Sequence, residues 1–284
     1  MKKRINKLLM ISLCLFLLIP CINVKADSAQ KYLALGADLT ESQKNKVLGM
    51  LGVTNIEDYE VITVTNQEEH EYLDGKIASH IIGSRALSCA SVELSKESGI
   101  DVLTQNITYC SAGMYQNALV TAGVENALVK VAGPFEISGT AALVGIIKAY
   151  ENVSGKEISQ DNKDTATQEL VTTGEISEKI GAENAEKLIA DVKQKVVEDK
   201  ITNKEDILNA IEESAENLKI SLSDHDKQKI QELMDKISSL DLNVDKLKEQ
   251  VKSIYDKLKS NEGLWNKIKS WFNKAKKWLK ELLQ

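Results

Sequence analysis

Arginine is almost missing from this chain of 284 residues, which has only Arg4 and Arg85 among its 36 basic side chains. The other basic residues are lysines, which bind phosphate and carboxylate groups as point charges rather than as two-pronged clamps. Acidic residues outnumber basic ones, and the formal net charge is −6. The scarcity of arginine and the excess of acid argue against general nucleic-acid binding.

Familiar catalytic and cofactor motifs are missing as well. No second histidine follows His70 at the spacing of a zinc-binding helix, and the sequence has neither a glycine-rich phosphate loop nor a Gly-x-Ser-x-Gly motif. A Cys89–His80 nucleophile and base, or a pair of carboxylates, could still meet in the fold, but carboxylates on acid-rich helices are usually just solvated. The sequence therefore names no catalytic, cofactor-binding or metal-binding residue.

The first 26 residues are typical of a secretory signal peptide. Four basic residues between positions 2 and 7 precede an apolar run over residues 8–20, which is short for a membrane span, and small residues flank Lys25. We expect removal of residues 1–26 and export of the rest; a transmembrane anchor is the alternative. Pro20 before Cys21 argues against lipidation. Because the segment carries five basic groups and no acid, its removal changes the net charge from −6 to −11.

Two cysteines, Cys89 and Cys110, remain after this cleavage. They lie on consecutive predicted strands, and a hairpin that turns at residues 98–101 would place them nearly opposite each other. An exported protein can keep a disulfide. The alternative is two separate buried thiols that act as small hydrophobic side chains, and the pattern does not choose between them.

The stretch from Thr121 to Tyr150 predicts a strand, a turn and a buried helix. Residues 126–132 form a β-branched apolar run, Gly133-Pro134 breaks it, and Ser138 can cap the uncharged helix that follows. Small residues on this helix let it lie close to a sheet. The helix start at residues 138–142 could hold an anion on its free N–H groups, but the favoured interpretation is close packing.

Residues 27–152 predict a mixed α/β domain. Residues 27–35 are expected to be irregular or weakly paired, and a Thr40–Gln43 capping box begins a helix that stops at Gly52. Strands and helices then alternate, which indicates a mixed sheet with helices packed on it. The predicted strands are residues 59–65, 85–94, 101–109 and 126–132, and further helices are predicted at 67–73 and 114–122.

Several of these segments resemble the YpuA-like family of exported Firmicutes proteins, classed as domain of unknown function 1002. The resemblance is carried by Tyr59–Glu69, Ala86–Leu94, Asn106–Thr108, Thr121–Val124, Ala132–Phe135 and Ser138–Ala142. It covers about residues 30–260, and it implies an exported protein with an N-terminal α/β region and a helical C-terminal region. It implies no catalytic residues, and Cys89 and Cys110 lie outside its pattern.

Residues 153–262 predict an acidic, all-α domain, since glycine, proline and strand patterns nearly vanish after residue 152. The apolar stripes of its last two helices, separated by a short loop, are expected to close on each other as an antiparallel hairpin. The predicted helices are residues 165–180, 183–199, 204–218, 224–240 and 244–260.

Residues 263–284 form a basic, tryptophan-rich amphipathic helix in this prediction. Six lysines stand against Glu281 alone, and the apolar face carries every tryptophan of the chain. Such a helix suits the surface of an anionic membrane or an envelope partner; alternatively, it folds back on the acidic helical region. The residues expected to make the contact are Trp265, Trp271, Phe272, Trp278, Lys267, Lys274 and Lys277.

Together these patterns predict a secreted, non-enzymatic binding or interaction module of the cell envelope. The partner would be an anionic membrane surface or an envelope protein rather than nucleic acid, and no cofactor is expected. The alternative function is a secreted hydrolase that acts on cell-wall material. A deep pocket with convergent carboxylates, or a cysteine and a histidine in contact, would favour that alternative.

Overall fold

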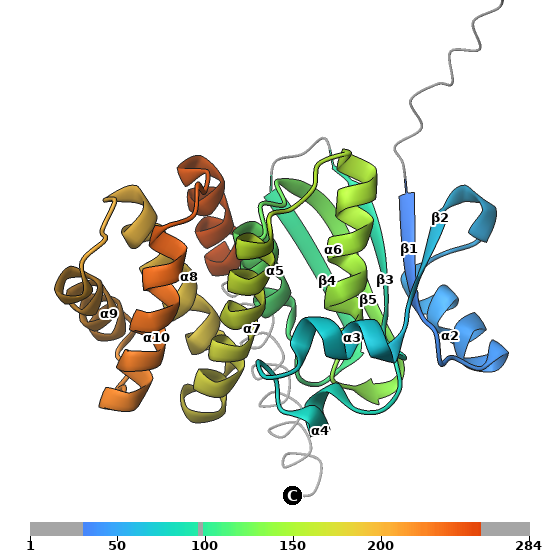
Figure 1. The fold of residues 1–284 in the computed structure, drawn as a ribbon, viewed down its shortest axis with the longest axis horizontal. Helices are drawn as coiled ribbons and strands as arrows, with labels where there is room; N and C mark the ends of the chain where they lie inside the picture. The colour runs from blue at the N-terminus through green and yellow to red at the C-terminus, as the bar shows by residue number, and fades with distance from the viewer. Residues whose placement is uncertain (1–30, 96–98, 257–284) are drawn as a thin grey trace, which may run out of the picture. The chain divides into compact units, whose positions relative to one another are not determined.

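A five-stranded mixed sheet forms the core of the first half of the chain (Figure 1). The computed structural model describes residues 31–95 and 99–256. The strand order is β2-β1-β3-β5-β4; β2 runs parallel to β1 and β4 parallel to β5, while β3 is antiparallel to both of its neighbours. The strands are β1 (Lys31–Gly36), β2 (Glu60–Val64), β3 (Cys89–Leu94), β4 (Gly99–Ile107) and β5 (Asn126–Ile137). The predicted mixed sheet is confirmed.

Helices cover both faces of this sheet. On one face, α5 (Ala112–Thr121) and α6 (Thr140–Ser154) pack on the main hydrophobic cluster, and α2 (Glu41–Leu51) packs on a smaller cluster on the other face. The capping box predicted for α2 is present, and the helix stops at Gly52. A Cβ on Gly145 of α6 would lie 2.5 Å from the Cβ of Ala34 on β1, so the predicted close packing of α6 on the sheet is confirmed.

The prediction for residues 27–35 was wrong where the structure describes them. Residues 31–36 form β1, which pairs with β2 on one side and β3 on the other. Leu33 and Leu35 enter the cluster under α2, whereas Tyr32 and Ala34 enter the cluster under α6. A strand buried on both faces belongs inside a sheet, and its short length had hidden that pattern.

The predicted hairpin between the two cysteine-bearing strands was also wrong. β5 lies between β3 and β4 and pairs with both. Ala127, Val129 and Val131 of β5 are buried in the main cluster on one face of the sheet, and Ala132 belongs to the smaller cluster on the other face. β5 also continues past Gly133-Pro134 to Ile137, because the proline lies beside a register shift between Gln105 and Ile107 of β4.

Five helices follow the sheet, at positions close to those predicted. They are α7 (Gln160–Ile180), α8 (Ala182–Glu198), α9 (Lys204–Leu218), α10 (Asp224–Ser238) and a helix over residues 244–256. Within the described residues, none of the helices has both the length and the apolar character that a membrane span requires.

The helical region shares buried surface with the sheet region. Ala166 and Leu170 of α7 join the main cluster, while Ile176 of the same helix belongs to a second cluster formed by α7 to α10. By its contacts, the described part of the chain forms one compact unit. The boundary at residue 152 remains a prediction.

The expected hairpin of the last two helices was wrong. The stripe of α10 packs into the cluster of α7 to α10, whereas Leu247 packs into the main cluster, and Val251 and Ile254 contact Ala190 of α8. Hydrogen bonds hold this last helix to α5, from Gln250 Nε2 to Asn117 Oδ1 at 2.5 Å and from Gln116 Nε2 to Ser253 Oγ at 3.2 Å. Polar contacts with α5 therefore decide where the last helix lies.

A buried ion pair joins the two regions. Nζ of Lys193 on α8 lies 2.8 Å from Oε1 of Glu169 on α7, and both side chains are fully buried. The same ammonium group donates to the Asn117 carbonyl at 3.0 Å and to Thr121 Oγ1 at 3.1 Å, both on α5. Three helices thus meet at one lysine.

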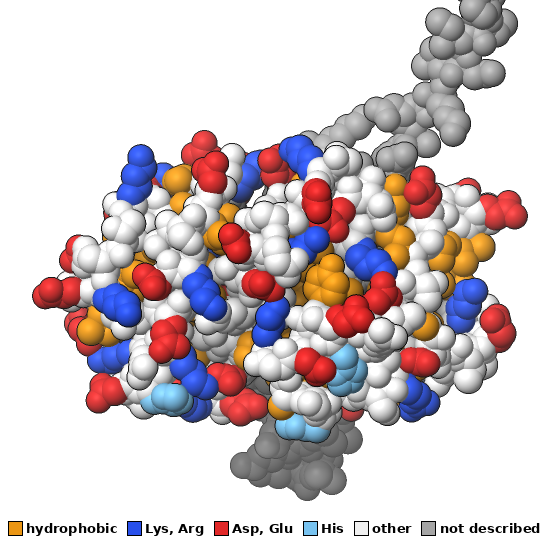
Figure 2. All heavy atoms as spheres, in the orientation of Figure 1, with side chains coloured by type: hydrophobic (Ala, Val, Ile, Leu, Met, Phe, Trp, Pro, Cys, Tyr) orange, Lys and Arg blue, Asp and Glu red, His pale blue; other side chains and the backbone are white. Residues whose placement is uncertain are grey.

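Outside the core, charges of both signs mix on the surface. Figure 2 shows lysine and arginine side chains interspersed with aspartate and glutamate over the visible face. Many of them pair between helices, such as Lys227 with Glu212 and Lys248 with Glu198, each at 2.6 Å. Exposed pairs of this kind contribute little stability individually.

Candidate functional site

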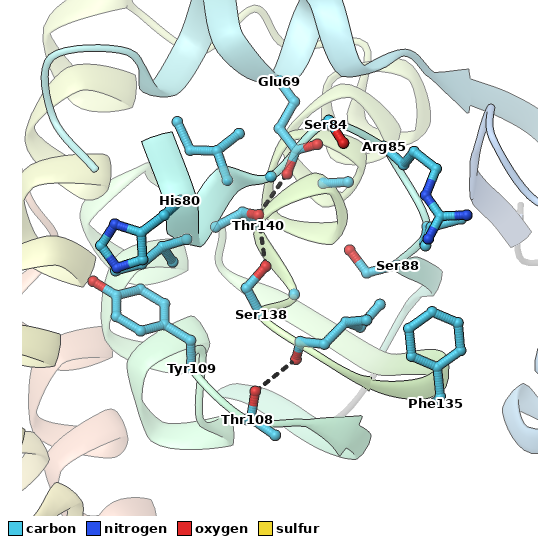
Figure 3. A pocket seen from close by; sticks show the side chains of 17 residues that line it. Glu69, His80, Ser84, Arg85, Ser88, Thr108, Tyr109, Phe135, Ser138 and Thr140 are labelled. Atoms are coloured by element: carbon cyan, nitrogen blue, oxygen red, sulfur yellow. Dashed lines mark hydrogen bonds between the residues drawn. The ribbon is translucent and has the colours of Figure 1, made fainter. Parts of the chain in front are cut away.

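A hollow of about 430 Å³ lies where the end of β5 meets the start of α6 (Figure 3). Its walls come from segments that are distant in sequence: α3 (Asn66–Leu73), α4 (Ser79–Ile82) with the loop that follows, the residues after β4, and the β5–α6 turn. Arg85 and Phe135 stand on one side of the hollow, and His80 and Tyr109 on the other. Polar side chains of the first region therefore converge on one pocket.

Glu69 is the deepest polar side chain of this pocket, and only 1 % of it is exposed. Thr140 Oγ1 donates to Glu69 Oε1 at 2.5 Å, and Asn66 Nδ2 donates to Oε2 at 3.3 Å. Ser138 Oγ lies 3.1 Å from Thr140 Oγ1, so a chain of hydroxyl groups leads from the carboxyl group to the pocket surface. Burial raises the pKa of Glu69, which favours its neutral form.

The start of α6 is built differently from the prediction. Gly139, not Ser138, is the N-cap, with a left-handed φ of 95°, and no side-chain hydrogen bond caps the helix from that position. Ser88, just before β3, accepts the Ala142 N–H at 2.8 Å instead. A Cβ on Gly139 would lie 2.5 Å from Tyr115 Oη, so this turn needs glycine both for its backbone and for its packing.

The first turn of α6 forms part of the pocket wall. Thr140 and Ala141 both line it, and N–H groups at the beginning of a helix have no acceptor within that helix. The helix dipole adds partial positive charge there. Residues 138–141 of the segment considered as an anion site thus line the pocket. The close packing favoured for this helix start is also present.

Arg85 brings the cationic group of the pocket. It is exposed, and no hydrogen bond or ion pair holds its guanidinium group within the described part of the chain. The backbone beside it is well fixed, since Ala86 N–H donates to Asp38 Oδ2 at 2.7 Å and the Ala86 carbonyl accepts from Asp38 N–H at 3.1 Å. Arg85 is thus an exposed cation next to a fixed backbone, and its side chain has no partner among the described residues.

The structure agrees with the second prediction for the two cysteines, namely two separate buried thiols. Both thiols are free and buried, Cys89 in the cluster under α2 and Cys110 in the main cluster. Burial raises the pKa of Cys89 to about 11 and that of Cys110 to about 12. Neither lines the pocket, whereas His80 does, so the Cys89–His80 couple does not form there.

The remaining predicted site residues stay predictions. The signal segment 1–26 and the contact residues of 263–284 (Trp265, Trp271, Phe272, Trp278, Lys267, Lys274 and Lys277) lie outside the described residues. Among the residues that are described, no group of three or more histidine, cysteine or acidic side chains has a metal-binding arrangement.

The sequence alone did not indicate that Arg85 and Glu69 line the same pocket. The one available signal was that Arg85 is the single arginine after residue 4 in a lysine-rich chain. Nothing distinguishes Glu69 from the acids around it in the sequence. Their proximity to one hollow is a product of the fold.

No solved structure matches this chain. The chain is 42 % identical over 279 residues to the uncharacterized protein YpuA of Bacillus subtilis (strain 168), an alignment that covers 91 % of this chain and 95 % of that protein. Residues 35–254 match the family described as proteins of unknown function, DUF1002. That span agrees with the resemblance seen in the sequence, and the chain belongs to the DUF1002 family.

Proposed function

We propose that the protein is an exported, non-enzymatic binding module of the cell envelope that holds an anionic group of its ligand in the pocket at α6. The observation that carries this proposal is the guanidinium group of Arg85, which lines the pocket and has no partner among the described residues. Arginine binds carboxylate and phosphate groups through two parallel hydrogen bonds. An exposed arginine beside a hollow is suited to that task.

The rest of the pocket supports an anionic ligand. Glu69 is the single carboxyl group among the lining residues, and both of its oxygens already accept hydrogen bonds, from Thr140 and Asn66. Ser138 and the amides of Thr140 and Ala141 offer donors, and Phe135, Ile81 and Ile137 offer apolar contact. A pocket with a few directed donors and an apolar wall is typical of small-molecule sites.

Binding fits this geometry better than hydrolysis. A glycosidase requires two carboxyl groups, and the lining contains one. The hydroxyl group that contacts Glu69 belongs to Thr140, which is 1 % exposed and cannot readily reach a substrate. The alternative, a secreted hydrolase of cell-wall material, predicts that purified protein releases soluble fragments from peptidoglycan and that Glu69→Gln abolishes the release.

Export and membrane contact rest on the sequence. Residues 1–26 have the pattern of a signal peptide, and residues 263–284 place three tryptophans opposite a lysine-rich face. We propose that this last segment contacts the anionic membrane surface. Protein truncated after residue 262 should lose co-sedimentation with phosphatidylglycerol vesicles, while the full chain should bind them in a salt-sensitive manner. Equal binding by both forms would end the membrane proposal.

The pocket is tested with two simple anions, sulfate and acetate. Either anion should cause saturable shifts of the Ser84, Thr140 and Ala141 amide resonances in NMR spectra. Arg85→Gln should weaken this binding about tenfold or more, since a charge-assisted hydrogen bond contributes about 1.5–3 kcal/mol. Lys252→Gln, which removes an exposed cation from the last helix, is the matched control and should bind like the parent. Unchanged binding in Arg85→Gln would contradict the proposal.

A further inference from the structure

His70 holds two acceptors at once. Its Nδ1 lies 2.7 Å from Asp74 Oδ1, and its Nε2 lies 3.0 Å from the carbonyl oxygen of Gly83. A carbonyl oxygen and an ionised carboxylate can only accept hydrogen bonds. A neutral imidazole has one N–H group and can donate to only one of them, so the two contacts together fit the doubly protonated ring.

The carbonyl group that His70 holds belongs to the loop that carries Arg85. Gly83 adopts a left-handed φ of 82°, and Arg85 follows two residues later. The far end of this short segment is held by the two hydrogen bonds between Ala86 and Asp38. At the near end, the Gly83 N–H donates to the Ser79 carbonyl at 2.8 Å, and the Gly83 carbonyl is held by His70 and, at a longer distance of 3.4 Å, by Asn66 Nδ2.

The helix α3 contacts the pocket from both sides. Glu69 binds Thr140 at the start of α6, and the adjacent His70 binds Gly83 at the rim. Asn66 links the two contacts, since its Nδ2 lies 3.3 Å from Glu69 Oε2 and 3.4 Å from the Gly83 carbonyl oxygen. A change at the His70 ring therefore reaches the rim of the pocket through Gly83.

The charges around His70 favour its protonated form. The hydrogen bond to Asp74, and then that to Gly83, raises the pKa of His70, and the nearby charges of Asp74 and Glu69 act in the same direction. The helices packed on α3 are α4, which carries His80, and α6, which carries Lys148; Lys148 is paired with Glu68 at 2.5 Å. Both contacts are present at low pH. As the pH rises through the raised pKa, the ring keeps only one N–H group; the charge of Asp74 favours Nδ1–H, so the donation to Gly83 is lost.

We propose that His70 is a pH-sensitive positioning residue for the pocket: its protonated ring fastens the Gly83–Arg85 segment to α3 and places the Arg85 guanidinium group for the ligand. This inference rests on the proposed anion-binding function. Ligand binding should therefore be tighter below the midpoint of His70 titration than above it. Loss of the Gly83 hydrogen bond frees the loop that carries the cation.

The first test needs no ligand. NMR titration should give one midpoint for the His70 ring resonances and the same midpoint for the amides of Gly83, Ser84 and Arg85. In Asp74→Asn the shared midpoint should move to lower pH, and in His70→Gln the titration of those three amides should vanish. His225→Gln on α10 is the matched control and should leave it unchanged. A His70 ring that titrates while the three amides do not follow would overturn the proposal.

The second test measures sulfate affinity between pH 5 and 8, where the charge of this probe is constant. The parent protein should bind sulfate severalfold more weakly above the His70 midpoint, and His70→Gln should lack that step. A step of equal size in His70→Gln would contradict the positioning role. If no form binds sulfate or acetate, the proposed function fails, whereas shared midpoints in the ligand-free titration would still support the His70 tie.

Discussion

Two buried glutamates stand in opposite surroundings in this protein. Glu169 on α7 is fully buried with Lys193 at 2.8 Å, and Thr121 donates to its second oxygen. Glu69 on α3 is as deeply buried, but hydroxyl and amide groups are its partners, and the pocket lies beside it. The first arrangement is complete within the protein and holds three helices together.

The second arrangement leaves a cation, Arg85, next to a hollow and without a partner among the described residues. This difference separates a structural polar cluster from a candidate binding site. Buried groups that satisfy each other need no ligand. Groups that converge on open space without pairing are the ones for which a ligand is expected.

The largest loss of stability is expected when the buried Lys193–Glu169 pair is broken. Lys193→Met leaves Glu169 as an uncompensated buried carboxylate and should lower the free energy of unfolding by about 3–5 kcal/mol. Urea denaturation followed by circular dichroism measures it. Lys248→Met, which breaks the exposed pair with Glu198, should change stability little. Similar losses in both variants would mean that the buried pair has no special structural role.

A smaller loss is expected at the turn that forms the pocket floor. Gly139→Val forces a β-branched residue into a φ of 95°, at a cost of about 1–3 kcal/mol, and adds a clash with Tyr115 Oη. Gly155→Val is the matched control, since its φ is 63° but no atom lies within 4 Å of the added Cβ. Equal destabilisation of the two variants, measured by urea denaturation, would show that close packing at the start of α6 matters little.

The smallest expected effect is a change in the pH dependence of stability when Glu69 is replaced. Because burial raises its pKa above the ordinary value of 4.5, the folded protein binds this proton more firmly than the unfolded chain. Glu69 therefore lowers stability as the pH rises from 4.5 through the folded pKa. Glu69→Gln removes that loss, so the stability of the variant relative to the parent protein should increase as the pH rises.

The control variant, Glu198→Gln, should change the pH dependence of stability in the opposite direction. The hydrogen bond from Lys248 lowers the pKa of Glu198, so Glu198 adds stability above 4.5 that is lost as the pH falls through the folded pKa. Glu198→Gln should therefore be less stable than the parent protein at neutral pH and equally stable in acid. Thermal unfolding between pH 3.5 and 8 checks both variants, and slopes of the same sign for the two would refute the assignment.

Local patterns along the chain determined much of this protein before any fold was known. The capping box at Thr40, the stop at Gly52, the uncharged run of α6 and the limits of α9 depend on neighbouring residues alone. Alternation of strands and helices was enough to predict a mixed sheet, and the quoted segments were enough to indicate the family.

The tertiary structure alone decided what depends on distant partners. β5 lies between β3 and β4, where both of its edges are paired and Ala127, Val129 and Val131 pack into the main cluster. This order separates β3, which carries Cys89, from β4, which precedes Cys110. The last helix joined α5 and α8 rather than α10 because its polar residues found partners there. Arg85, Glu69 and His70 became a site only when the fold brought the Gly83–Arg85 loop and the start of α6 against α3, and sequence spacing carries no record of such contacts.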